Sequence, residues 1–159
     1  MKASHFSADI QDFLVLLYRH GVKYVIVGGE AVIYYGYARL TGDVDFFYER
    51  TEENVKRLFR SLSDFWQGDI PGLHDSAELL EEGIIIQFGL PPNRIDLLNK
   101  LEGVGFEDAW VNKAEEEMQI RGKMIPVYFI GIDSLIMNKT CSGRYKDLED
   151  LQFLMKAKQ

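Results

Sequence analysis

The sequence contains few of the residues that would place it outside the ordinary globular class. Cys141 is its single cysteine, which excludes a disulfide framework and a zinc site built from several thiolates. No apolar run approaches the roughly 20 residues of a membrane-spanning helix. The first residues, MKASHFSADIQDF, contain no apolar segment of the kind found in secretory signals. These absences favour the cytoplasm and predict no membrane partner.

Basic residues are also in the minority. The 159 residues include 18 Lys and Arg against 25 Asp and Glu, for a formal net charge of −7 at pH 7. A broad DNA-binding or RNA-binding surface needs clustered basic residues, so this balance argues against one but allows a local basic rim around a site. At this length we expect one domain spanning residues 1–159, with a helical C-terminal part from about 131 to 159.

Hydrophobic spacing predicts an α+β (mixed α/β) fold. Ser7 is the expected N-cap of a helix that ends at Gly21, and Thr51 that of a helix that ends near Phe65. Strands are expected at 23–27, 43–48, 84–88, 94–98, 117–121 and 123–129, and further helices at 30–37, 76–82, 106–112, 132–140 and 145–157. The short loop between 84–88 and 94–98 suits an antiparallel hairpin. The order of elements indicates a short mixed sheet flanked by helices, ending in a helix pair.

Two aspartates lie two residues apart in the strand expected at 43–48. Positions i and i+2 of a strand share a face, so Asp43 and Asp45 point the same way. Two ionised carboxylates about 7 Å apart repel by roughly 2 kcal/mol at an effective dielectric constant near 20. A cation between them relieves this repulsion, and Mg²⁺ or Mn²⁺ suits oxygen ligands. The same pattern is also typical of the hydrated face of an edge strand.

A third aspartate, Asp96, lies in the strand expected at 94–98. Its neighbours Ile95 and Leu97 point to the opposite face, whereas Arg94 shares the face of Asp96. An aspartate in an apolar strand needs a partner for its charge. That partner is either an arginine or a metal site shared with the other two aspartates, which requires the two strands to be neighbours.

Three further features are candidates for the same site. Gly28-Gly29 follows a strand and precedes a helix, where free backbone N–H groups can hold an anion. Lys139 prolongs an apolar helix stripe, so its amine either contacts a ligand or extends into solvent. Arg39 either binds phosphate or pairs with Asp43 or Glu30.

These blocks together resemble the nucleotidyltransferase superfamily, whose signature is a Gly-Gly or Gly-Ser turn followed by D-x-D. Here the signature is VGGEAVIYYGYARLTGDVDFF, residues 27–47. The closer likeness is to the small bacterial branch that includes AbiEii-type and MenT-type toxins. Residues 87–110 look like the third-carboxylate strand of that branch, and residues 138–154 are similar to its C-terminal helix pair with Lys and Arg-x-Lys-Asp. The likeness covers about residues 23–155 and implies a nucleotidyltransferase-like fold.

The resemblance implies an enzyme that moves a nucleoside monophosphate from a nucleoside triphosphate (NTP) to an acceptor and releases pyrophosphate. Asp43 and Asp45 would bind the metal ions, Mg²⁺ or Mn²⁺, that carry the triphosphate, and Asp96 would complete the metal site that activates the acceptor. Nucleotide contacts would come from Gly28, Gly29, Arg39, Thr41, Lys139 and Asp147.

The acceptor is left open by the sequence: a tRNA, a protein side chain or a small molecule. Two alternatives to catalysis are a nucleotide-binding or partner-binding module of the same fold, and a toxin–antitoxin component whose partner is an antitoxin. A degenerate copy would be expected to lose at least one of the three carboxylates, and all three are present.

Overall fold

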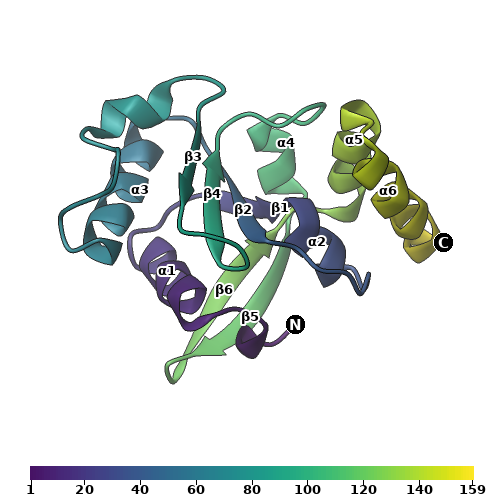
Figure 1. Ribbon diagram of the computed structural model, residues 1–159, viewed down its shortest axis with the longest axis horizontal. Coiled ribbons are helices and arrows are strands. Elements are labelled where there is room, and N and C mark those ends of the chain that lie inside the picture. Colours follow the sequence, from purple (N-terminus) through teal and green to yellow (C-terminus); the bar gives the residue numbers. More distant parts are fainter.

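The computed structural model describes residues 1–159, which form a six-stranded mixed sheet with helices on both faces (Figure 1). The strands are β1 (Tyr24–Val27), β2 (Asp43–Tyr48), β3 (Ile85–Phe88), β4 (Arg94–Leu98), β5 (Ala114–Ile120) and β6 (Lys123–Phe129). Their order is β3-β4-β2-β1-β6-β5. β2 runs parallel to β4 and β1 parallel to β6, whereas the other neighbours are antiparallel. The predicted mixed sheet and the β3–β4 hairpin are confirmed.

The helices are η1 (Ala3–His5), α1 (Ala8–Arg19), α2 (Gly28–Tyr34), α3 (Glu52–Phe65), η2 (Ser76–Leu80), α4 (Phe106–Val111), α5 (Ile132–Ser142) and α6 (Tyr145–Lys158). Both expected N-caps are present, because the hydroxyl of Ser7 accepts from the Ile10 N–H and that of Thr51 from the Asn54 N–H. None of the helices is both long and apolar enough to cross a membrane.

Several element boundaries differ from the sequence expectation, most clearly those of β5, α2 and η2. β5 begins at Ala114, not near 117, because the glutamate-rich start of the strand is paired with β6 although it shows no apolar alternation. α2 begins two residues early, at Gly28, and ends at Tyr34. The segment expected as a helix over 76–82 is a shorter 3-10 helix, Ser76–Leu80.

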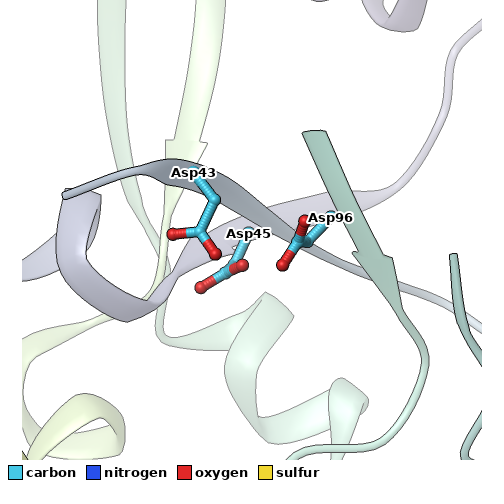
Figure 2. A group of neighbouring side chains, drawn as sticks. All are labelled: Asp43, Asp45 and Asp96. Atoms are coloured by element: carbon cyan, nitrogen blue, oxygen red, sulfur yellow. The ribbon is translucent and has the colours of Figure 1, made fainter. Parts of the chain in front are cut away.

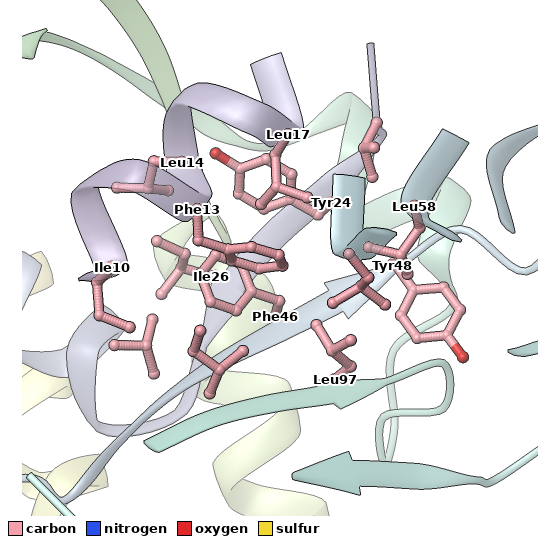
Figure 3. Packing of buried hydrophobic residues seen from close by; sticks show 14 of the residues in the cluster. Ile10, Phe13, Leu14, Leu17, Tyr24, Ile26, Phe46, Tyr48, Leu58 and Leu97 are labelled. Carbon is pink, nitrogen blue, oxygen red and sulfur yellow. The ribbon is translucent and has the colours of Figure 1, made fainter. Parts of the chain in front are cut away.

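The sheet separates two hydrophobic clusters. On one face, Phe13, Leu14 and Leu17 of α1 pack against Ile26 and Phe46 of the sheet (Figure 3). Burial of side chains of this size contributes roughly 1.5–3 kcal/mol each, which strongly favours one strand register over a slipped one.

The other face of the sheet carries the smaller cluster, in which Val25, Val27 and Phe47 pack against buried residues of α2, α4, α5 and α6. Since side chains alternate along β2, Asp43 and Asp45 lie on the same face as Phe47. β2 lies between β1 and β4. The two aspartates are therefore not on the hydrated face of an edge strand, which was the alternative left open by the sequence.

Candidate active site

Asp43, Asp45 and Asp96 converge on one face of the sheet (Figure 2). The parallel pairing of β2 with β4 sets Asp45 directly opposite Asp96, and Asp43 opposite Arg94. One oxygen from each carboxylate lies within 4.8 Å of the other two. Asp96 is buried, whereas the other two are half-buried. The predicted convergence of the three carboxylates is confirmed, and their chemical roles stay a prediction.

Arg94 forms a bridge between two of the carboxylates. Its Nη2 donates to Asp43 Oδ2 at 2.8 Å, and its Nε donates to Asp96 Oδ1 at 2.8 Å. The amide of Gln87 also donates to Asp96, at 3.3 Å. Asp45 is not among the acceptors of Arg94. Both partners considered for Asp96 are therefore present: an arginine and a shared carboxylate cluster.

The cluster carries more negative charge than one guanidinium can neutralise. Burial, followed by the charges of Asp43 and Asp96, raises the pKa of Asp45 to about 8, against the opposing effect of Arg94. In the absence of a further cation, the folded protein therefore holds a proton on Asp45 at a pH where an unfolded chain would have lost it.

In metal-free buffer, Asp45→Asn is expected to stabilise the protein at pH 8. The unfolded aspartate has a pKa of about 3.9, so between about pH 4 and pH 8 the folded state binds more protons and stability falls as pH rises. Asparagine removes this loss, and we expect a gain of about 1 kcal/mol or more at pH 8 that disappears near pH 4, since one pKa unit corresponds to about 1.4 kcal/mol. Urea unfolding in EDTA at both pH values measures the gain. The exposed Asp69→Asn is the control, and an equal effect of Asp45→Asn at both pH values would contradict the expectation.

The carboxylates line a cleft of about 530 Å³ formed by residues of β2, β3, β4 and α5. This volume lies in the range of small-molecule sites, roughly 300–1,000 Å³. Four basic side chains also line the cleft: Arg94, Lys100, Lys139 and Arg144. The cleft thus gathers basic side chains beside its acidic ones, which are Asp43, Asp45, Asp96 and Glu102.

Lys139 lines the cleft, but its amine is buried and paired with two carboxylates. Its Nζ lies 3.1 Å from Asp147 Oδ1 and 3.1 Å from Asp150 Oδ2. Asp150 also accepts from Arg39 Nη2 at 3.1 Å, and Asp147 accepts from Arg144 Nε at 2.8 Å. Of the alternatives that the sequence left open, the extension of the Lys139 amine into solvent and the pairing of Arg39 with Asp43 or Glu30 are therefore wrong.

Three side chains donate hydrogen bonds to the carboxylate of Asp147 and stabilise its negative charge. Although burial raises the pKa of this carboxyl, hydrogen bonds from Arg144, Ser142 and Lys139 outweigh burial and hold the pKa below its usual range. Asp147 therefore stays ionised and anchors Arg144, whose side chain is 75% exposed beside the cleft.

The Gly28-Gly29 pair has a clear packing role in this site. Gly28 has a φ of +65°, and a Cβ at this position would overlap the carboxylate of Asp45. A Cβ on Gly29 would overlap Thr41, whose hydroxyl donates to Asp43 Oδ1 at 3.2 Å. The glycines thus make room for two parts of the site, and their contact with phosphate stays a prediction.

The structure divides the predicted site residues into two groups. Those that line the cleft are Gly28, Asp43, Asp45, Asp96 and Lys139. Those that lie behind it and contact the lining residues or their partners are Gly29, Arg39, Thr41 and Asp147.

Among the polar residues that line the cleft, the sequence interpretation did not assign Gln87, Arg94, Asn138 or Arg144 to the site. The register of the β3–β4 hairpin places Gln87 opposite Asp96. The hairpin expected from the sequence could therefore have identified Gln87 as a neighbour of the carboxylates. No sequence pattern distinguishes Asn138, because only the packing of α5 against the sheet places it at the cleft.

Comparison with known proteins agrees with this fold. A family model described as nucleotidyltransferase of unknown function (DUF6036) matches residues 6–155. Among solved structures, an antigenic nucleotidyltransferase-like protein from Paracoccidioides brasiliensis is similar, with a TM-score of 0.51 and 15% sequence identity over 96% of this chain and 77% of that chain. At this identity the likeness shows the fold alone. No curated protein matches the chain, and the AbiEii-type or MenT-type branch stays a prediction.

Proposed function

Because the chain belongs to the family of nucleotidyltransferases of unknown function, we propose that it is an enzyme that transfers a nucleoside monophosphate from an NTP to an acceptor. One observation carries this proposal: the in-register parallel pairing of β2 and β4 brings Asp43, Asp45 and Asp96 together in a cleft of about 530 Å³. The acceptor would be a tRNA, a protein side chain or a small molecule.

The chemistry of the donor set fits a hard divalent cation. Three carboxylates offer oxygens within 4.8 Å of one another, and oxygen is the ligand that Mg²⁺ and Mn²⁺ prefer. Burial and then the charges of Asp43 and Asp96 raise the pKa of Asp45, and a cation at this place would favour the ionised form of its carboxylate. When bound, such a cation supplies charge neutralisation for the triphosphate and a lower pKa for the attacking group of the acceptor.

In the proposed reaction, a nucleophilic oxygen or nitrogen of the acceptor attacks the α-phosphorus of the NTP. The bond between the α- and β-phosphates breaks, pyrophosphate leaves, and the acceptor loses one proton to solvent. Asp43 and Asp45 on β2 would hold the triphosphate through the cation, while Thr41 fixes the orientation of Asp43. Asp96 on β4 would act on the acceptor side.

The buried ion network has a positioning role in this proposal. Arg144 is an exposed arginine at the cleft, and its guanidinium can bind phosphate oxygens through two N–H groups. Its partner Asp147 is held in turn by Lys139. Lys139 would therefore act through Asp147 and Arg144, since its own amine already contacts two carboxylates.

Mg²⁺ or Mn²⁺ together with a cognate NTP is expected to stabilise the fold, because a ligand that binds only the native state adds RT ln(1 + [L]/Kd). At a ligand concentration of 100 Kd this gain is about 2.7 kcal/mol, or a rise in Tm of about 5–10 °C for a chain of this length. Thermal melts with each of the four NTPs, with and without metal, measure the shift, and Asp45→Asn is the matched control. The absence of a shift for all four NTPs at millimolar concentration would contradict a nucleotide-binding role.

A second candidate function is partner binding by the same fold, as in a toxin–antitoxin component. The observation that favours it is a set of exposed apolar side chains on α5 and α6: Met137, Tyr145, Leu148 and Met155. A wild-type protein that binds NTP and never transfers its nucleotide would favour this candidate over the enzyme.

A further inference from the structure

Arg94 lies where a cation would bind the carboxylate cluster. Its guanidinium donates to Asp43 Oδ2 at 2.8 Å and to the two oxygens of Asp96 at 2.8 and 3.1 Å. No other positively charged side chain donates a hydrogen bond to the three aspartates. The metal-free cluster is thus closed by a positive group that belongs to the chain itself.

The guanidinium and a divalent cation compete for the same carboxylates. A magnesium or manganese ion requires direct contact with carboxylate lone pairs at about 2.0–2.2 Å, and Arg94 already uses lone pairs on Asp43 and Asp96. The two cations also repel each other across the few ångströms of the cluster. Occupancy of the cluster by one therefore disfavours occupancy by the other.

The position of Arg94 allows its guanidinium to release the aspartates as well as to bind them. Its side chain is 30% exposed and lines the cleft, so it can swing outward without opening the hydrophobic core. A planar guanidinium with five N–H donors binds phosphate as readily as carboxylate. An Arg94 released from the aspartates would remain in the same cleft as the triphosphate.

We propose that Arg94 is a displaceable counter-ion, which neutralises part of the charge of the cluster in the metal-free protein and competes with the divalent cation for Asp43 and Asp96. Binding of the cation releases the guanidinium into the cleft, where it becomes available to phosphate. Metal affinity and phosphate affinity are thereby linked through one side chain. The inference rests on the proposed function in one respect: the cluster must bind a divalent cation.

The test is a titration of the full chain with Mn²⁺ alone, followed by the electron paramagnetic resonance signal of free Mn²⁺. Arg94→Gln is expected to bind Mn²⁺ at least tenfold more tightly than the wild type. The matched control is Lys100→Gln, which removes one positive charge from the same cleft. Lys100 pairs with Glu82 at 3.6 Å and is not within salt-bridge distance of the three aspartates, so we expect a change within about twofold.

Unfolding measurements supply a second readout. In EDTA, Arg94→Gln is expected to have a lower Tm than the wild type, because three clustered carboxylates lose their counter-ion, and Mn²⁺ is expected to raise the Tm of the variant more than that of the wild type. If Arg94→Gln does not fold, Arg94→Lys keeps the charge but cannot span both aspartates, and its Mn²⁺ affinity is expected to exceed that of the wild type by a smaller factor.

Each outcome of the titration decides something specific. Equal or weaker Mn²⁺ binding by Arg94→Gln, beside normal binding by the wild type, would overturn the role of Arg94 and leave the proposed function standing. A lack of Mn²⁺ binding by the wild type and by both Arg94 variants would overturn both proposals.

Discussion

Asp96→Asn is expected to lower nucleotide transfer by roughly 10²-fold or more while it leaves NTP affinity within a few fold. Asp43 and Asp45 come from β2 and would hold the cation that carries the triphosphate, whereas Asp96 comes from β4 and would act on the acceptor. A contribution on the acceptor side is felt mainly in the transition state. The expected loss corresponds to about 2.7 kcal/mol of barrier.

The comparison needs nucleotide affinity by titration and label transfer to an acceptor pool, for wild type and variant side by side. Asparagine keeps the volume of aspartate and one oxygen that can bind metal, so the change isolates the charge. Asp45→Asn is expected to lose nucleotide binding and transfer together, and exposed Asp69→Asn to lose neither. Transfer by Asp96→Asn at the wild-type rate would remove Asp96 from catalysis.

Lys139→Met is expected to destabilise the fold by about 3 kcal/mol, the lower end of the range for breaking a buried ion pair. The amine of Lys139 is the shared partner of Asp147 and Asp150, and all three side chains are buried. Methionine fills a similar volume and leaves both carboxylates short of one donor. Their remaining partners, Arg39 and Arg144, limit the loss.

Urea unfolding at pH 7 measures this loss, and Lys146→Met on the exposed surface of α6 is the matched control, expected to change stability by less than about 0.5 kcal/mol. The pKa of Asp147 is lowered in the folded state, so its stabilisation is present above the unfolded pKa of about 3.9 and fades as pH falls below it. The difference between wild type and Lys139→Met should therefore shrink in acid. Equal stability of Lys139→Met and Lys146→Met would show that the buried network contributes nothing.

The elements that carry the carboxylates were predictable because their patterns are local. Strand alternation alone places Asp43 with Asp45 on one face, and β2 and β4 have the boundaries that the sequence indicates. The contact between Asp45 and Asp96 depends on β4 pairing in parallel with β2, which is a non-local choice. The sequence is compatible with β2 and β4 as neighbours, but only the fold shows that they pair.

The partners of the basic residues were not predictable from spacing. Lys139 and Arg39 both pair with Asp150, which is 11 and 111 positions away in the chain. These contacts follow from the packing of α5 against α6 and from the course of the chain between α2 and β2. Charge pairs across elements depend on packing geometry, which hydrophobic periodicity does not encode.

The most direct test of nucleotide transfer is the movement of an α-phosphate label from each of the four NTPs into the RNA, protein and small-molecule fractions of a cell lysate. With Mg²⁺ or Mn²⁺, the wild-type protein should incorporate label from at least one NTP, and incorporation should disappear with EDTA or in Asp45→Asn. A wild-type protein that incorporates no label into any fraction from any NTP, with either cation present, would contradict the account.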